Sequence, residues 1–159
     1  LAGHSYSFFH CVTIYPTPLA EMHLARLEYL RKFSPSIGFS DHSLVVRDGI
    51  KASIVAIMLG VEYIERHFTI LPSDQTRDGP VSINPYQLED CVKFSKLPRD
   101  EVRAYVDEHI PEYPIMMGQE RRELSDEELS NRDYYRGRFA SNIGYQTIYN
   151  WEHVDIDFE

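Results

Sequence analysis

The stretch SIGFSDHS, residues 36–43, sets a short apolar run directly before a group of polar side chains. Two further stretches have the same form, namely SFFHCVTIYPTP at residues 7–18 and VEYIERHFT at residues 61–69. Each apolar run has strand character and is followed by a segment with helical signals, so the sequence predicts the order β-α-β-α-β-α. Parallel strands joined by helices indicate an α/β fold, either a doubly wound sheet or a (β/α)8 barrel.

Capping signals mark the expected helices. The first is expected to begin at Thr17-Pro18, where threonine can cap free N–H groups and proline loses no hydrogen bond. The second is expected from about Asp48 to Leu59, with Gly60 at its C-terminal cap. The third is expected to begin at Asn84, which precedes a proline at the first helical position.

The composition becomes more polar from Pro98 onward. A helix is expected to open there and to end before Pro111, followed by a loop to Gly118 and a second short helix whose capping box begins at Ser125. The C-terminal tail reads as a small β-hairpin. The expected domains are therefore residues 1–97, a helical linker over residues 98–133, and a short β-hairpin tail over residues 134–159.

The composition also excludes several classes of function. With 159 residues, the chain is long enough for one domain with a substantial core. The formal net charge of −9 argues against a nucleic-acid partner, because phosphate binding requires clustered lysine and arginine. No run approaches about eighteen apolar residues, so no membrane span is expected. Cys11 and Cys91 show no disulfide pattern, and we interpret both as reduced thiols of a cytoplasmic protein.

Polar side chains follow each of the three expected strands. The carboxyl ends of parallel strands lie on one face of an α/β fold, where active sites are assembled. Three separate strands therefore deliver one group of residues toward the same place, namely Tyr15, Ser40, His42, Glu65 and His67. This convergence indicates a catalytic or binding site at that face.

His42 and His67 are the candidate metal ligands. Neutral imidazole suits divalent transition metals, and two histidines leave positions open for water and substrate oxygens. The alternative is that both are hydrogen-bonded histidines near the core, and the residues alone leave the two interpretations open. His10 lies mid-strand beside Phe9 and Cys11, so we expect it to be packed rather than to bind a metal.

Glu65 and Arg66 are neighbours on a strand and so point to opposite faces. Glu65 shares a face with His67, where it is expected either to act as an acid or base or to form a structural ion pair. Asp41 is expected to face away from this site by the same alternation. The loop over residues 74–80 is either a lid over the site or a solvated turn.

Three segments, over residues 10–18, 37–43 and 63–69, together resemble the sialic acid synthase family, which makes N-acetylneuraminate and related nonulosonic acids. Their order and spacing match the last three β-α units of that family's (β/α)8 TIM barrel. The resemblance implies that residues 1–97 are the C-terminal part of such a barrel. Because three strands cannot close a barrel and the chain starts at Leu1 rather than methionine, we expect it to begin inside a longer protein.

The resemblance implies a metal-dependent condensation of phosphoenolpyruvate with an N-acetylated aldose, usually N-acetylmannosamine, that releases phosphate. His42 and His67 would hold the divalent ion, usually Mn²⁺ with Mg²⁺ or Co²⁺ as alternatives, and the ion would polarise the sugar aldehyde. Ser40 would contact phosphoenolpyruvate, and Tyr15 would pack against the amino sugar. Glu65 would stand beside them as a polar catalytic residue. The family also implies a homodimer.

The sequence departs from the family pattern at three places. Thr13 occupies a position where the family commonly has asparagine, so its contact to phosphoenolpyruvate is expected to be weaker or different. Asp78 precedes Gly79-Pro80, whereas the family commonly has aspartate after this pair, and we expect Asp78 to serve in its place near the sugar. Many members add an antifreeze-like domain that donates an arginine to the partner's site. Here Arg136 or Arg138 is the candidate replacement.

The family's phosphate-binding lysines lie on earlier strands that this sequence does not contain, so we expect no synthase activity from the chain alone. Two other interpretations compete with that of a synthase. In the first, the chain is a non-catalytic interaction module whose binding surface lies over residues 98–133. In the second, it is part of another metal-dependent barrel enzyme such as an aldolase.

Overall fold

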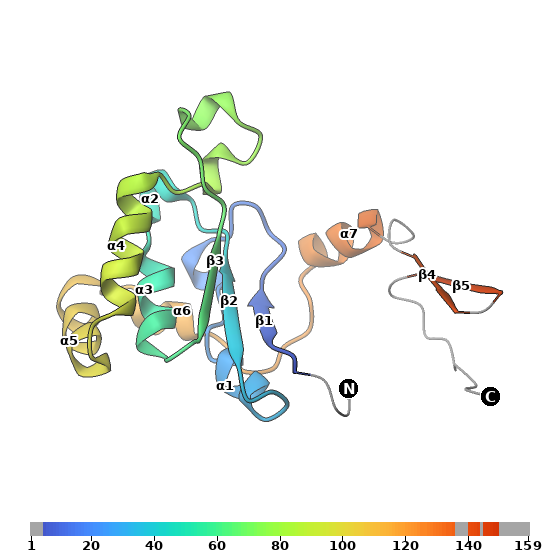
Figure 1. Ribbon diagram of the computed structural model, residues 1–159, viewed down its shortest axis with the longest axis horizontal. Helices are drawn as coiled ribbons and strands as arrows, with labels where there is room; N and C mark the ends of the chain where they lie inside the picture. Colours follow the sequence, from blue (N-terminus) through green and yellow to red (C-terminus); the bar gives the residue numbers. More distant parts are fainter. Residues whose placement is uncertain (1–4, 136–139, 144, 150–159) are drawn as a thin grey trace. The chain divides into compact units, whose positions relative to one another are not determined.

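The computed structural model describes residues 5–135, 140–143 and 145–149. The chain divides into two compact units, residues 1–122 and residues 123–159. The first unit contains a three-stranded parallel sheet in the order β1 (Phe8–Cys11), β2 (Ile37–Asp41) and β3 (Tyr63–Arg66) (Figure 1). The α/β fold with a parallel sheet is the one that the alternating strand and helix signals predicted.

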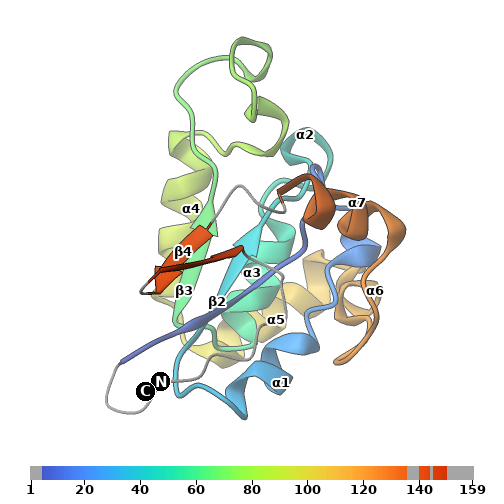
Figure 2. The ribbon, with the colours of Figure 1, turned by 90° about the vertical axis from the view of Figure 1, so that its right-hand side faces the viewer.

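The helices of the first unit follow the strands in turn. They are α1 (Arg26–Arg31), α2 (Val45–Asp48), α3 (Lys51–Met58), α4 (Pro85–Ser95), α5 (Arg99–His109) and α6 (Tyr113–Met117), with 3-10 turns η1 (Leu19–Glu21), η2 (Ser73–Gln75) and η3 (Gly79–Val81). Figures 1 and 2 both show α3 and α4 along the same face of the sheet. These helices cover that face, so a site can lie at the strand ends or on the other face.

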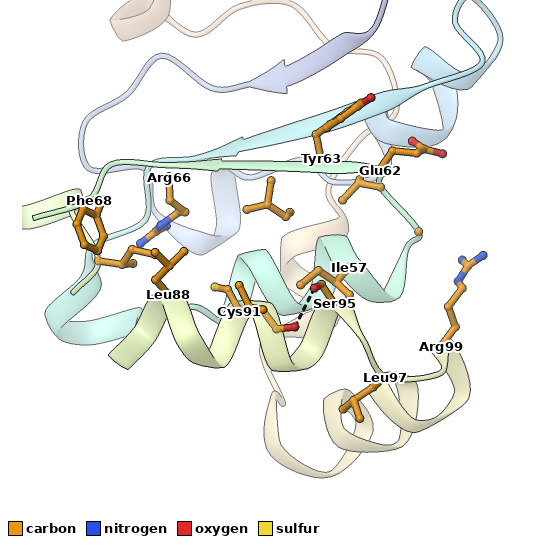
Figure 3. Close-up of a pocket in the computed structure, with 15 residues that line it drawn as sticks. Ile57, Glu62, Tyr63, Arg66, Phe68, Leu88, Cys91, Ser95, Leu97 and Arg99 are labelled. Atoms are coloured by element: carbon orange, nitrogen blue, oxygen red, sulfur yellow. Dashed lines mark hydrogen bonds between the residues drawn. The ribbon is translucent and has the colours of Figure 1, made fainter. Parts of the chain in front are cut away.

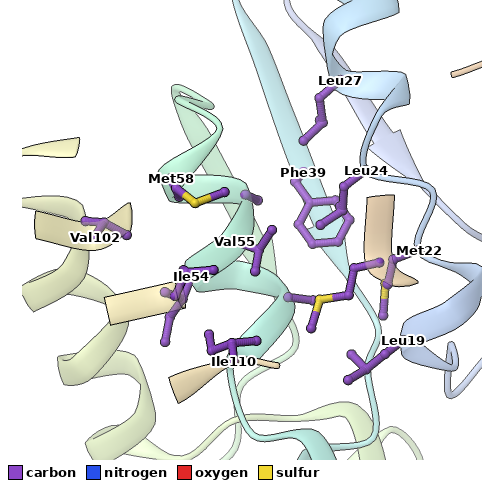
Figure 4. Packing of buried hydrophobic residues seen from close by; sticks show 14 of the residues in the cluster. Leu19, Met22, Leu24, Leu27, Phe39, Ile54, Val55, Met58, Val102 and Ile110 are labelled. Atoms are coloured by element: carbon purple, nitrogen blue, oxygen red, sulfur yellow. The ribbon is translucent and has the colours of Figure 1, made fainter. Parts of the chain in front are cut away.

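The core lies between the central strand β2 and the helix α3. All five residues of β2 are buried, and Phe39 at its middle has no exposed surface. Figure 4 shows Phe39 with the side chains of the η1–α1 segment on one side and those of α3 on the other. The core continues into α5 through Val102 and Val106 and into α6 through Met116. Burial of this kind stabilises the fold through the hydrophobic effect, which grows with the apolar area removed from water.

The first expected helix does not begin at Thr17. The Thr17 hydroxyl donates a hydrogen bond back to the Ile14 carbonyl (2.6 Å), and its N–H donates to the His42 carbonyl (2.8 Å), so it extends the pairing with the β2 end instead of capping a helix. Only the 3-10 turn η1 follows directly. His23, with φ of +47°, separates that turn from α1.

The second expected helix, over residues 48–59, is present as α3, which starts at Lys51, and the short helix α2 before it was not expected. Gly49, with φ of +57°, ends α2, and α3 starts two residues later. A residue without a Cβ adopts this left-handed conformation at little cost, which explains why the break falls here. At the far end, the Gly60 N–H donates to the Ile57 carbonyl (2.8 Å), so its predicted place as the C-terminal cap is confirmed.

The later helices agree with most of the capping signals. At α4, Asn84 and Gln87 form the predicted capping box, with both bonds at 3.0 Å. α5 ends before Pro111 as expected, but α6 stands where a loop was expected, because Met116 is fully buried in the core. Since α5 and α6 pack into the first unit, the structure divides after Arg122 rather than after residue 97.

The second unit contains one helix and one hairpin. α7 (Asp126–Tyr135) begins at a capping box in which the Ser125 hydroxyl accepts from the Glu128 N–H (3.3 Å). The strands β4 (Ala140–Ile143) and β5 (Gln146–Tyr149) pair antiparallel, which confirms the predicted hairpin. In the ranges that the structure describes, no helix combines the length and apolarity needed to cross a membrane.

Candidate active site

The carboxyl ends of the three parallel strands bring two histidines and a tyrosine together. His42 follows β2, His67 follows β3, and Tyr15 lies in the segment that leaves β1. The ring centroids of the two histidines are 5.2 Å apart, and the Tyr15 ring lies 4.1 Å from that of His42 and 6.3 Å from that of His67. Residues separated by more than fifty positions in the sequence thus form one cluster, at the place that the strand pattern indicated.

The two imidazoles differ in exposure. His42 is 4 % exposed, whereas the side chain of His67 is 36 % exposed. Burial, and secondarily the nearby His67, lower the pKa of His42, because both disfavour the protonated ring. His42 is therefore held as neutral imidazole near neutral pH, the form that can coordinate a metal.

Backbone pairing fixes the segment around His42. The His42 carbonyl accepts from the Thr17 N–H, and Thr17 and Ser43 form an isolated parallel bridge. On the ring itself, Nδ1 lies 3.8 Å from the Sγ of Cys11. The β1 loop that carries Tyr15 is thereby tied to the end of β2.

Ser40 and Glu65 form a direct polar pair across the sheet. They are register partners on β2 and β3, and the Ser40 hydroxyl donates to Oε1 of Glu65 at 2.6 Å. Ser40 is buried and Glu65 is exposed, so the carboxylate is the more accessible of the two. Glu65 points away from Arg66, as the strand alternation predicted, and its partner is a hydroxyl rather than a guanidinium.

Asp78 lies on the loop that follows His67. Its Oδ2 is 3.7 Å from Nδ1 of His67, and its side chain is 53 % exposed. The loop is folded closely on itself, because a Cβ placed on Gly79 would lie 1.7 Å from the backbone oxygen of Ser73. Its ends are joined by a hydrogen bond from the Ile83 N–H to the His67 carbonyl (2.8 Å). The structure therefore brings Asp78 to the histidine cluster.

Of the three remaining predicted site residues, the structure describes only one. Thr13 is exposed in the segment between β1 and Tyr15. Arg136 and Arg138 fall outside the described residues. His10 is packed, as expected: its Nε2 lies 2.7 Å from the Met22 carbonyl, and burial lowers its pKa to about 4.

The sequence reading missed the partner of Arg66. On the face of the sheet opposite the histidines, Arg66 forms an ion pair with Asp41 at 2.6 Å, and the two side chains are 3 % and 0 % exposed. Strand alternation predicted that both would face away from the site. Their pairing depends on the register of β2 against β3, which places Asp41 directly opposite Arg66.

A pocket of about 800 Å³ lies beside β3 and α4. Figure 3 shows Arg66 and Phe68 at one end of it and Arg99 at the other, with Leu88 and Cys91 of α4 along one side. Neither histidine of the cluster lines this pocket. It is therefore separate from the candidate active site.

The chemistry of the cluster fits a divalent ion with an incomplete protein ligand set. Two imidazoles at neighbouring strand ends are donors suited to a divalent transition-metal ion. Within the described parts of the chain, no group of three or more His, Cys, Asp or Glu residues is arranged to hold a metal. An ion here would take its remaining ligands from water or substrate oxygens, which is the open coordination expected of a catalytic site.

The fold and the cluster define an α/β protein with histidines at the carboxyl ends of its parallel strands. Residues 2–99 match the NeuB family, and the chain belongs to this family. The predicted resemblance to sialic acid synthases is thereby confirmed.

Named relatives agree with this assignment. A pseudaminic acid synthase of Campylobacter jejuni is 32 % identical over 149 residues, which cover 92 % of this chain and 38 % of the relative. An N-acetylneuraminate-9-phosphate synthase of Drosophila melanogaster is 36 % identical over 86 residues, which cover 53 % of this chain and 22 % of the relative.

Two solved structures share the fold. The spore coat polysaccharide biosynthesis protein SpsE of Bacillus subtilis is 29 % identical with a TM-score of 0.62, over 82 % of this chain and 36 % of that protein. The N-acetylneuraminic acid synthetase of Leptospira borgpetersenii, solved with citrate, is 26 % identical with a TM-score of 0.52, over 81 % and 39 % of the two chains. The chain thus spans about a fifth to two fifths of the length of these four proteins.

Proposed function

We propose that this chain carries the metal-binding part of the active site of a nonulosonic acid synthase. The observation that carries the proposal is the His42–His67 pair, 5.2 Å apart beside Tyr15, at strand ends in a member of the NeuB family. The relatives are named as synthases of pseudaminic acid, N,N'-diacetyllegionaminic acid and N-acetylneuraminate 9-phosphate. These products share the class of nine-carbon keto sugar acids.

In the proposed reaction, the terminal carbon of phosphoenolpyruvate forms a bond with the aldehyde carbon of an N-acetylated aldose, and phosphate is released on hydrolysis. A divalent ion held by His42 and His67, either Mn²⁺, Mg²⁺ or Co²⁺, would polarise the aldehyde oxygen. The buried neutral imidazole of His42 can bind the ion without first losing a proton, because burial already lowers its pKa.

The remaining side chains are assigned to the two substrates. The Ser40–Glu65 pair supplies a hydroxyl and a carboxylate on the histidine face of the sheet, with Thr13 close by in sequence to Tyr15. Tyr15 is 51 % exposed and offers its ring to the amino sugar. Asp78, beside His67, is placed to accept hydrogen bonds from sugar hydroxyls. Arg136 or Arg138 stays our candidate for the charge that the antifreeze-like domain supplies in other members.

We also propose that the sheet is the last part of a (β/α)8 barrel, completed by further β-α units. In the described residues β3 pairs with β2 alone. Beside its free edge lie the pocket of about 800 Å³ and the half-exposed rings of Tyr63 and Phe68. A neighbouring unit would cover these apolar groups.

The proposal extends to the assembly and its location. A homodimer would bring a second chain's arginine to each site, as in members with an antifreeze-like domain. We propose a location in the reducing cytoplasm, where Cys11 and Cys91 would stay as thiols.

Titration with Mn²⁺ tests the metal site. We expect calorimetry to detect one bound ion per chain, and His42→Ala and His67→Ala each to weaken binding at least about tenfold. His109→Ala, at an exposed position on α5, is the matched control and should bind as the wild type does. Unchanged binding in the His42→Ala, His67→Ala double variant would refute the assignment and favour a non-catalytic module.

An activity assay tests the substrates. Phosphate release should require both phosphoenolpyruvate and an N-acetylated aldose, and the longer polypeptide should be needed for turnover. Steady release by the 159-residue chain alone would contradict the proposal that further units complete the site. Turnover with an aldol donor in place of phosphoenolpyruvate would identify an aldolase instead.

A further inference from the structure

The ion pair between Asp41 and Arg66 is the most deeply buried pair of charges in the described part of the chain. Nη1 of Arg66 lies 2.6 Å from Oδ1 of Asp41, with the two side chains 3 % and 0 % exposed. Buried charges of this kind are costly to desolvate, and apolar replacements of equal volume are often as stable. The pair therefore calls for an explanation other than stability.

Arg66 contacts the residues on either side of His42. Nη1 donates to the Asp41 carbonyl (3.2 Å) and to the Ser43 hydroxyl (2.9 Å), and these two residues flank His42 in sequence. Nη2 reaches the Gly49 carbonyl (3.5 Å) at the end of α2. One guanidinium thus contacts the backbone carbonyl of the residue before the histidine and the side-chain hydroxyl of the residue after it.

Asp41 is fixed from two further directions. Its Oδ1 accepts from the Ser43 N–H (2.8 Å), and its Oδ2 accepts from the Ser53 hydroxyl on α3 (2.6 Å). The carboxylate therefore joins the end of β2 both to the guanidinium and to the helix beneath. A carboxylate with this many donors has little freedom to move.

Arg66 is also the covalent neighbour of His67. Asp41 and Arg66 face each other in register, and strand alternation sends the next residue of each strand, His42 and His67, to the opposite face. We propose that Arg66 is a positioning residue which, through Asp41 and Ser43, sets the separation of the two histidines. The inference rests on the proposed function, because it concerns the metal site assigned there.

The separation of the two histidines determines whether they can bind one metal ion together. Two imidazoles bind one ion only when their nitrogens meet within its coordination distance, and residues that orient such ligands typically change metal affinity by about 10- to 100-fold. Asp41 and Arg66 are register partners, so their ion pair supplies such a constraint from the far side of the sheet.

A charge-neutral double variant separates positioning from stability. Asp41→Asn combined with Arg66→Met removes both charges and leaves no buried charge without a partner. We expect it to stay folded, with an unfolding midpoint near that of the wild type, and to bind Mn²⁺ about 10- to 100-fold more weakly in calorimetry. The matched control is Asp107→Asn with Arg103→Met, which removes an exposed ion pair on α5 and should leave Mn²⁺ binding unchanged.

Arg66→Lys is the second variant. Lysine keeps the charge opposite Asp41 but lacks the planar fork that also reaches Ser43 and Gly49. We expect a smaller loss of Mn²⁺ affinity than in the double variant. If the double variant fails to fold, Arg66→Lys still tests the positioning role. If Arg66 acted only by pairing its charge with Asp41, the lysine variant would bind Mn²⁺ with wild-type affinity.

A metal-free measurement distinguishes failure of this inference from failure of the proposed function. In NMR spectra, contacts between the Tyr15 and His42 rings, 4.1 Å apart, and between the His42 and His67 rings should weaken in both variants. If the wild type binds no Mn²⁺, the proposed metal site is wrong, while the ring contacts still report on positioning. If the wild type binds and both folded variants bind equally well with unchanged ring contacts, Arg66 has no positioning role.

Discussion

β2 and β3 each end in a histidine of the candidate site, but the two strands are held very differently. β2 lies between two partners, and all five of its residues are buried. β3 pairs on one side in the described residues, and Tyr63 and Glu65 on it are exposed. His42 is accordingly enclosed and His67 partly open. The comparison shows that His42 is positioned by the core itself, whereas His67 follows a strand that has one partner in the described residues.

Removing an aromatic ring from each strand is the sharpest test of this difference. Phe39→Ala in β2 should lower the free energy of unfolding by roughly 3–5 kcal/mol, because it leaves a cavity at a position with no exposed surface. Tyr63→Ala in β3, where the side chain is 51 % exposed, should cost less than about half as much. Urea denaturation measures both, and equal losses would show that β3 is as firmly packed as β2.

A pH series extends the comparison to β1, whose His10 is buried. Burial lowers the pKa of His10 from 6.5 to about 4. Between these two values His10 is protonated in the unfolded chain but stays neutral in the folded chain. The free energy of unfolding should therefore fall as the pH drops from 6.5 to 4, by roughly 3 kcal/mol from this residue. In His10→Gln this contribution should vanish, while the exposed His109→Gln should keep the wild-type slope. A His10→Gln variant as acid-sensitive as the wild type would contradict the expectation.

The Ser40–Glu65 hydrogen bond is the direct polar link between the two strands on the site face. Ser40→Ala removes it and should cost about 1–2 kcal/mol of unfolding free energy, because the hydroxyl is buried and its acceptor is a carboxylate. Ser95→Ala, which removes an exposed hydroxyl on α4, is the control and should cost much less. If Ser40→Ala left the free energy of unfolding unchanged, water would hydrogen-bond the Glu65 carboxylate as well as the Ser40 hydroxyl does.

Asp78 should contribute least to stability. Its carboxylate is half exposed and 3.7 Å from His67, so Asp78→Asn should change the free energy of unfolding by less than about 0.5 kcal/mol. Its effect is expected on the apparent affinity for the amino sugar in the complete enzyme. A large loss of stability would show that the loop is a structural part of the β3 end.

Sequence reasoning located the cluster because parallel strands share a polarity. Once three runs were identified as consecutive parallel strands, Tyr15, His42 and His67 had to meet at one edge, and they do. Alternation along a strand likewise separated Glu65 from Arg66 and Asp41 from His42. These predictions needed no knowledge of side-chain conformations.

The remaining features depend on tertiary contacts that a linear pattern does not encode. Thr17 has the sequence context of a helix cap, yet its polar groups are used by Ile14 and His42. Gly49 interrupts a run of helix-compatible residues because the chain turns there to reach α3. The Asp41–Arg66 pair follows from the register of β2 against β3, and no local signal sets that register.

The close approach of Gly79 to Ser73 has a consequence for protein engineering. Loops are usually the parts of an enzyme where residues can be exchanged or inserted freely. In this loop the backbone oxygen of Ser73 occupies the space of any side chain at position 79, so Gly79 must be kept in any designed library. The exposed residues Asp74, Gln75 and Arg77 between them are the positions to randomise. Diversity introduced there would alter the surroundings of Asp78 while the loop keeps its frame.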